Sequence, residues 1–249
     1  GDCTVLMASA GADIQLDTRD SSQPLLLLPQ MGMVTGMVAS IALPLQTVIT
    51  TAGANVESVV PALGGYLASE MNTTAPGQIR KFNMDGTLDE SFTPISAMGN
   101  IGLAISSDEA KLFVAVMNGV SEFDLTASGG TLVRTINVSA HTSMVNGLCL
   151  SSDGSMLYAT EAGWTFNQTT YQIYQKETSA RLMAITLADG TVESLLPDMT
   201  PDHSPNGCVV HPDNSNLVYM VNMWHGVTAW DRVNGNVEVS WGANIVTNT

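Results

Sequence analysis

The sequence predicts an all-β protein, a β-propeller of four-stranded antiparallel blades, and three observations carry this prediction. Three segments are near-copies: they begin at Gly102, Gly147 and Gly207 and read GLAISSD, GLCLSSD and GCVVHPD. Ten residues after each of these glycines comes an apolar pair: Leu112-Phe113, Leu157-Tyr158 and Leu217-Val218. The copies are 45 and 60 residues apart, and self-similarity over tens of residues is typical of repeat architectures.

Each repeat shows four strand signals in the same order. A short apolar strand follows the Gly, and a turn at Ser-Asp or Pro-Asp leads to a second apolar strand. An alternating third strand then ends in a Gly-containing turn before the fourth. The second strands are expected at 112–116, 157–161 and 217–221, the third at 120–125, 182–187 and 227–232, and the fourth at 192–196 and 237–241. Four antiparallel strands repeated around an axis describe a propeller, and the alternative is a β-sandwich.

The pattern extends towards both ends of the chain. Tyr66–Glu70 and Ile79–Met84 match the second and third strands, and further strands are expected at 5–9, 13–18 and 25–28. The segment 242–246 resembles the start of a first strand near Gly53. We therefore expect residues 1–249 to form a single propeller domain whose ring is closed by the C-terminal strand. The blade number is five, or six if 31–52 contains another.

The charge and hydropathy of the chain exclude two classes of partner. The sequence has 23 acidic and 8 basic residues, a net charge of −15, and is 45% hydrophobic. Such an acidic protein is not expected to bind nucleic acid or anionic membranes. The apolar run 31–49 contains Gly32, Gly36 and Pro44, so it predicts buried strand and no insertion into a membrane.

The acidity, the few lysines and three glycosylation sequons favour an extracellular, secreted protein. The sequons predict N-glycans at Asn72, Asn137 and Asn167. Of the three cysteines, Cys149 and Cys208 lie two residues and one residue after their Gly, so they are expected to face opposite sides of their strands. The sequence therefore predicts two buried thiols rather than a disulfide.

Asparagines gather at one register of the repeat. Asn146 and Asn206 directly precede their Gly, and Asn55 and Asn244 fall at the same register. In a propeller this position lies at the mouth of the central channel. Converging amide oxygens and a carboxylate would suit Ca²⁺, a hard cation that prefers oxygen ligands. Candidate carboxylates are Glu57, Glu70 and Glu161; the alternative is that Asn before Gly only makes a tight turn.

One part of the chain resembles a known family. The segment VNGLCLSSDGSMLY at 145–158 resembles the "NGLxxSPDGxxLY" signature of the SMP-30/gluconolactonase superfamily. Pro205-Asn206-Gly207 and the segment WHGVTAW at 224–230 resemble that family's next blade, as found in fungal-type lactonohydrolases. The resemblance covers roughly 140–245. It implies a six-bladed propeller that holds one divalent cation in its channel, with Asn146 as a ligand, and that hydrolyses lactones.

Two positions differ from that family. The family has Asp where this chain has Asn206, and an amide cannot accept a proton at neutral pH. Its ligand Glu on the first inner strand has no clear counterpart here. The catalytic base is therefore expected among Glu161, Asp202 and His203, with Glu70 as a further candidate. The chain is predicted to be either a cation-dependent lactone or ester hydrolase, or an inactive extracellular module that binds a small molecule or protein partner.

Overall fold

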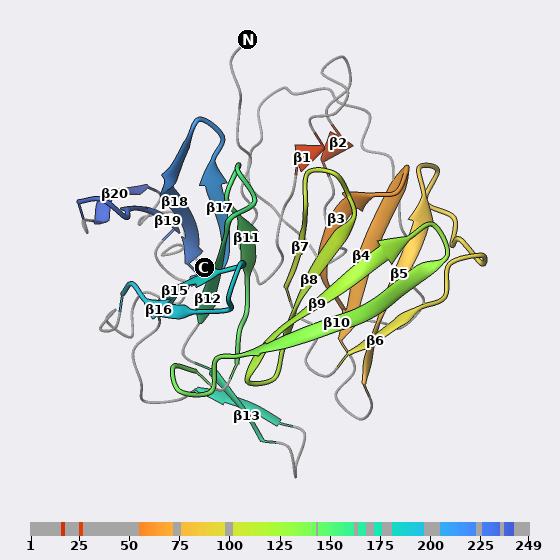
Figure 1. The fold of residues 1–249 in the computed structure, drawn as a ribbon, viewed down its shortest axis with the longest axis horizontal. Helices are drawn as coiled ribbons and strands as arrows, with labels where there is room; N and C mark the ends of the chain where they lie inside the picture. The colour runs from red at the N-terminus through yellow and green to blue at the C-terminus, as the bar shows by residue number, and fades with distance from the viewer. Residues whose placement is uncertain are drawn as a thin grey trace, which may run out of the picture.

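The four complete sheets of the structure are the blades of a β-propeller (Figure 1). The structure is a computed structural model that describes residues 16–17, 25–26, 55–71, 76–97, 102–142, 144–161, 164–167, 172–175, 181–196, 205–222, 226–234 and 237–241. All regular structure in these ranges is β-strand, as predicted. Within them, no helix has the length and apolarity that a membrane crossing requires.

Each blade is an antiparallel meander of four strands in chain order, and in blade 3 a hairpin is inserted between the second and third strands. Blade 1 contains β3 (Asn55–Ala62), β4 (Gly65–Met71), β5 (Gly77–Asn83) and β6 (Ile95–Ala97). Blade 2 contains β7 (Leu103–Ile105), β8 (Lys111–Val116), β9 (Gly119–Thr126) and β10 (Gly129–Asn137). Blade 3 contains β11 (Leu148–Leu150), β12 (Met156–Glu161), β15 (Arg181–Thr186) and β16 (Val192–Ser194). Blade 4 contains β17 (Pro205–His211), β18 (Asn214–Asn222), β19 (Gly226–Asp231) and β20 (Val237–Trp241).

Two further hairpins lie outside the blades. Between β12 and β15, β13 (Trp164–Asn167) pairs with β14 (Gln172–Gln175). Near the N-terminus, β1 (Leu16–Asp17) pairs with β2 (Leu25–Leu26), inside two strands predicted for an additional unit. The structure thus contains four blades in its described part. The ring-closing strand predicted at 242–246 and the unit sought in 31–52 lie outside that part.

The turn between the first two strands is built by the same side-chain bonds in blades 2 and 3. The Ser106 hydroxyl donates to Asp108 Oδ1 over 2.6 Å and accepts from the Lys111 amide. The Ser151 hydroxyl donates to Asp153 Oδ1, also over 2.6 Å, and accepts from the Met156 amide. These serine hydroxyls are the main reason that the pKa of Asp108 and of Asp153 lies below its ordinary value. Local bonds of this kind explain why the repeat is visible in the sequence.

The blades pack face to face, and three apolar clusters fill the spaces between them. The cluster between blades 1 and 2 includes Leu67, Ile79 and Leu112. That between blades 2 and 3 is built on residues such as Phe113, Leu157 and Met183, and that between blades 3 and 4 on Tyr158, Met220 and Trp230. Because both faces of a middle blade are buried, its strands are apolar on successive residues rather than on alternate ones.

An ion pair beside β5 predicts one pH-dependent part of the stability. Lys81 Nζ lies 2.6 Å from Asp89 Oδ2, and the hydrogen bond from Lys81, with those from Ser91, lowers the pKa of Asp89 to about 2. Its carboxylate therefore stabilises the fold above about pH 4, the ordinary value, and this contribution is lost as the pH falls through 2. We expect Asp89→Asn to lower the melting temperature at pH 7, and the deficit to shrink as the pH is lowered from 4 towards 2. Thermal unfolding of both proteins checks this, with exposed Glu90→Gln as control; a deficit that does not change with pH would contradict it.

Candidate functional site

The first strand of each blade lies at the inner edge of its sheet. In the order of every sheet, β3, β7, β11 and β17 each stand at one end. These four strands are also neighbours in space, because β7 contacts β3 on one side and β11 on the other, and β11 contacts β17. They lie towards the middle of the molecule in Figure 1. The beginnings of these strands therefore form the rim of the candidate site.

Glycines let the inner strands approach until their backbones touch. A Cβ on Gly147 would lie 2.5 Å from the carbonyl oxygen of Asn206 and 2.5 Å from the Cα of Gly207. A Cβ on Gly102 would lie 2.3 Å from the carbonyl oxygen of Asn146. Only glycine fits at such a distance from neighbouring backbone. The two asparagines that the sequence predicted at one register are thus on adjacent inner strands whose backbones are in contact.

Polar bonds hold the start of β11 against the second strand of its own blade. The Gly147 amide donates to Thr160 Oγ1 over 3.0 Å, and the Asn146 amide donates to the carbonyl oxygen of Thr160 over 2.8 Å. Blade 1 repeats the arrangement: the Ser58 amide donates to Ser69 Oγ over 3.0 Å. Ser58 therefore occupies the place of Gly147, and Ser69 that of Thr160.

This register changes which residue of blade 1 belongs to the asparagine row. Directly before Ser58 comes Glu57, which is the extra residue of a β-bulge between Val56 and Ser58. Asn55, which the sequence aligned with Asn146, pairs with Met71. Asn55 precedes Glu57 by two residues and therefore lies outside the row. Sequence spacing could not show the bulge, which accounts for one of the two residues that separate Asn55 from Glu57. The inner row, as the structure places it, consists of Glu57, Asn146 and Asn206.

A second row of buried polar residues ends the neighbouring strands. Glu70 is the second-last residue of β4, Glu161 is the last residue of β12, and Asn222 is the last residue of β18. Their exposed fractions are 7%, 1% and 4%. The sequence analysis did not identify Asn222. Its offset of 15 residues from Gly207 is close to the offset of 14 residues between Gly147 and Glu161. The difference of one residue comes from the irregularity in β17 between Val210 and His211.

Burial raises the pKa of two carboxyl groups in these rows. Desolvation raises the pKa of Glu57 above its ordinary value. It also raises that of Glu70, although the guanidinium of Arg80, with its Nε 3.2 Å from Glu70 Oε2, acts in the opposite direction. A desolvated carboxylate gains most from a nearby cation, since burial penalises its charged form.

The predicted site residues divide into two groups. Asn146, Asn206 and Glu161 are described and lie on blades 3 and 4, and Asn55 begins β3. Asp202, His203 and Asn244 lie outside the described residues. In the part of the chain that the structure describes, no three His, Cys, Asp or Glu side chains are grouped as a metal site would need. A cation at this rim would therefore need amide, carbonyl or water oxygens in addition to any carboxylate of the described residues.

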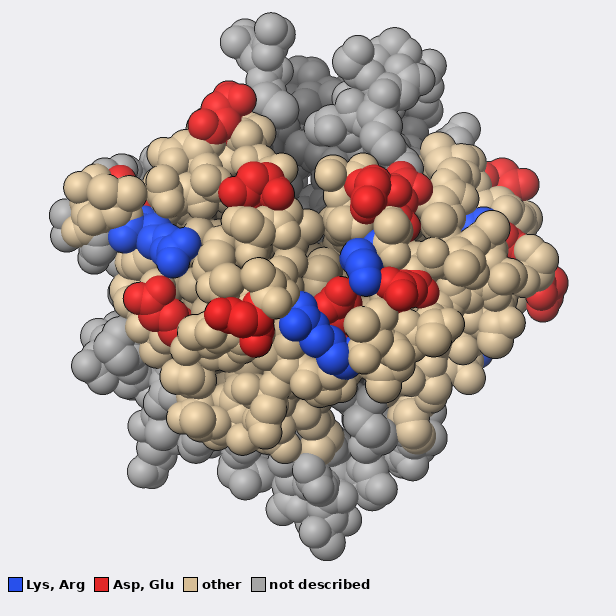
Figure 2. Space-filling view, viewed as in Figure 1, with Lys and Arg blue, Asp and Glu red and all other residues tan. Residues whose placement is uncertain are grey.

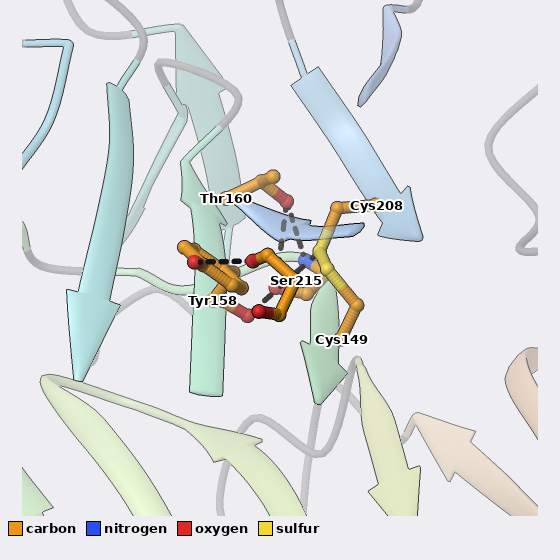
Figure 3. The surroundings of a disulfide bond; sticks show 6 residues. Cys149, Tyr158, Thr160, Cys208 and Ser215 are labelled. Carbon is orange, nitrogen blue, oxygen red and sulfur yellow. Dashed lines mark hydrogen bonds between the residues drawn. A yellow bond between two sulfur atoms is a disulfide. The ribbon is translucent and has the colours of Figure 1, made fainter. Parts of the chain in front are cut away.

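A disulfide joins the same two inner strands, and this corrects the sequence prediction. Cys149 and Cys208 are bonded, with 5.6 Å between their Cα atoms, whereas two separate buried thiols were expected (Figure 3). The two side chains do face opposite sides of their sheets. Because adjacent blades pack face to face, opposite sides bring them together: Cys149 faces blade 4 and Cys208 faces blade 3. The prediction was wrong because it treated the two strands as isolated.

The cations on the described surface are neutralised by neighbouring carboxylates. Arg134 Nε lies 2.7 Å from Glu122 Oε2, and Lys111 Nζ lies 3.2 Å from the other oxygen of the same carboxylate. In Figure 2 the acidic groups outnumber the basic ones on the face shown, and basic groups lie beside acidic ones. Arg134 also donates to the carbonyl oxygen of Leu187, which ties blade 2 to blade 3. These cations therefore act within and between blades and do not form a basic patch.

Known structures share this fold, while sequence comparison identifies no relative. No protein-family model and no curated protein sequence matches the chain. A chain of a nidogen/laminin complex superposes with a TM-score of 0.54 at 14% identity, covering 78% of this chain and 66% of that one. A putative 6-phosphogluconolactonase from Bacteroides fragilis superposes with a TM-score of 0.50 at 15% identity, covering 76% and 54%. A β-propeller domain from Myceliophteria thermophila superposes with a TM-score of 0.50 at 12% identity, covering 72% and 54%.

These likenesses establish a β-propeller and no particular activity. The chain spans between 54% and 66% of the length of the three structures. One of them is described as a lactonase and another belongs to a complex between proteins, so the fold by itself does not choose between the two predicted functions.

Proposed function

We propose that this chain is a divalent-cation-binding β-propeller of the gluconolactonase type, with Ca²⁺ held at the inner rim and used to hydrolyse a lactone or ester. The observation that carries the proposal is the shared register of Glu57, Asn146 and Asn206 at the starts of three inner strands. A carboxylate from β3 and two amide oxygens from the adjacent starts of β11 and β17, with β7 between β3 and β11, are oxygen ligands of the kind that Ca²⁺ prefers, with water completing the coordination. Asn55 and Asn244 remain candidate ligands from the sequence.

The burial of these groups agrees with such a site. Asn146 is 6% exposed, although asparagine is usually a surface residue. Desolvation raises the pKa of Glu57 and so disfavours its ionised form, and a cation bound beside it would offset this effect. Amide ligands are neutral, which fits the small number of carboxylates at the rim.

Calcium binding tests the proposal. We expect calorimetry to show a site in the wild-type protein and Asn146→Ala to weaken binding by about tenfold or more, because one oxygen ligand is lost. Asn83→Ala is the matched control, since the exposed Asn83 side chain bonds only to Thr87 in a surface hairpin. No heat of binding at millimolar Ca²⁺ would overturn the proposal, as would equal affinity in Asn146→Ala.

For hydrolysis, a bound divalent cation supplies polarisation of the carbonyl group and a lowered pKa of bound water. The chain must then supply a base, and Asn206 cannot act as one. We assign this role to Glu161, because it follows Thr160, the residue that holds Asn146 and Gly147 in place. The Glu161 side chain is 1% exposed, so bulk water is excluded from it. Asp202 and His203 are the other candidates.

Turnover separates a hydrolase from a binding protein. We expect hydrolysis of a simple lactone, followed by pH-stat, to be abolished by EDTA. We expect Glu161→Gln to lower the rate about 10²–10⁴-fold, the usual contribution of a general base. Calcium affinity should be retained in that variant, which serves as its own control for folding. Full activity in Glu161→Gln would remove this residue from the mechanism.

The second candidate is an extracellular binding or assembly module without catalysis. Asn206, in the place of the family's acidic residue, favours it. The disulfide also supports an extracellular location, since such bonds persist in oxidising compartments. The exposed Asn137 at the end of β10 suits a glycan, and mass spectrometry of protein secreted by eukaryotic cells tests that site. Calcium binding without any lactone or ester turnover would favour this second function.

A further inference from the structure

The disulfide lies beside the two asparagines of the candidate cation site, which gives it a second role. We propose that Cys149 and Cys208 are positioning residues whose bond holds Asn146 and Asn206 at the separation that a cation requires. This inference rests on the proposed cation site. It concerns the affinity of that site, in addition to the stability that any disulfide provides.

Sequence distance and packing place the bond next to the rim. Asn146 precedes Cys149 by three residues, and Asn206 precedes Cys208 by two. Both segments belong to inner strands, and between them the Gly147 position lies against the carbonyl oxygen of Asn206. Cys208 Sγ also lies 3.8 Å from the carbonyl oxygen of Tyr158, so the disulfide packs against the second strand of blade 3 (Figure 3).

The junction between blades 3 and 4 is already tied at other points. The Tyr158 hydroxyl donates to the carbonyl oxygen of Ser215 over 3.0 Å, near the beginning of β18. Arg232 Nη2 lies 3.6 Å from Glu193 Oε2, further out in the same two blades. With the apolar cluster between the blades, these contacts secure the junction away from its inner edge. The disulfide ties the inner strands themselves.

Other inner strands are joined without a covalent bond in the described part of the chain. The Leu103 amide of β7 donates to Ser58 Oγ of β3 over 3.3 Å. Strands β7 and β11 meet at Gly102, which packs on the backbone of Asn146. The covalent tie thus occurs at the junction that carries both asparagines. Ligands that are fixed before binding lose less conformational freedom on binding, so the tie increases affinity.

Comparing affinity with stability tests this role. The double variant Cys149→Ser/Cys208→Ser should raise the Kd for Ca²⁺ by about 10–100-fold, the usual effect of residues that orient metal ligands. The control is Tyr158→Phe, which removes a tie of the same junction but not at its inner edge. It should lower the melting temperature and leave the Kd unchanged. Calorimetry with Ca²⁺ and differential scanning calorimetry supply the two measurements.

The outcomes distinguish this inference from the proposed function. If the wild type binds no Ca²⁺, the proposed function fails and the inference falls with it. If the wild type binds and the double variant binds equally well, the disulfide is only a structural staple and this inference alone is overturned. If the double variant does not fold, the wild type reduced in the folded state by a phosphine replaces it. There the S–S bond is broken, two thiols form with protons from water, and the phosphine is oxidised to its oxide; unchanged affinity after reduction overturns the inference.

Discussion

Gly147→Ala is expected to destabilise the propeller by about 3 kcal/mol or more, the upper end of what overpacking costs. The added methyl carbon would lie 2.5 Å from two backbone atoms of the next blade and 2.8 Å from Thr160 Oγ1. Relief would require the inner strands to separate. The hydrogen bond from the Gly147 amide to Thr160 Oγ1 on one side and the disulfide on the other oppose that movement. Chemical denaturation followed by circular dichroism gives the free energy of unfolding.

Gly154→Ala is the matched control for this substitution. Gly154 lies in the next turn of the same blade, and no atom lies within 4 Å of a Cβ built there. Its φ of +69° is in the left-handed region, so alanine should cost about 1–2 kcal/mol from backbone strain alone. A Gly147→Ala variant no less stable than Gly154→Ala would show that β11 and β17 do not approach closely at Gly147. That result would contradict the backbone contact between the segments that carry Asn146 and Asn206.

Removing the disulfide should lower the free energy of unfolding by about 4 kcal/mol. The bond joins residues 59 apart, and the entropy of closing such a loop in the unfolded chain accounts for this magnitude. The apolar cluster between blades 3 and 4 also contains Cys149, so some packing is lost as well. Guanidinium unfolding of Cys149→Ser/Cys208→Ser against the wild type measures the difference.

The single variants provide the control for this prediction. Each of Cys149→Ser and Cys208→Ser breaks the same bond, so each alone should cost nearly as much as the double variant under non-reducing conditions. Two residues that share one interaction are not additive. Small single costs that add up to the double cost would show that the two thiols are not bonded, as the sequence had predicted.

The stability measurements report on the scaffold, and the affinity measurements report on the candidate cation site. Gly147 and the disulfide lie where blades 3 and 4 meet at the rim, and Asn146 and Glu57 are the residues proposed to supply oxygen ligands there. A variant that loses stability but keeps calcium affinity has changed the scaffold alone. One that loses affinity at unchanged stability has changed the site.

The candidate site was predictable only in part. Asn146 and Asn206 were found because each directly precedes the Gly of its repeat, and the structure places them on adjacent strands. Glu57 was noticed as a carboxylate, but the spacing assigned its place in the row to Asn55. Asn222 was missed since its offset differs by one residue. The offset of Asn222, and one of the two residues that separate Asn55 from Glu57, come from irregularities in the strands, which the spacing of the repeat does not contain.

The sequence alone determined the class of fold, the order of strands and the hairpin turns. Each blade is a meander of consecutive strands, and its turns are closed by neighbouring side chains such as Ser151 and Asp153. Such local interactions repeat as residue patterns and can be recognised without coordinates. The packing of the blades, which the residue pattern does not contain, brings Cys149 to Cys208, places Glu57 in the same row as Asn146, and sets Gly147 against the next blade. These contacts join residues far apart in the chain, and they arise when two separate sheets pack against each other.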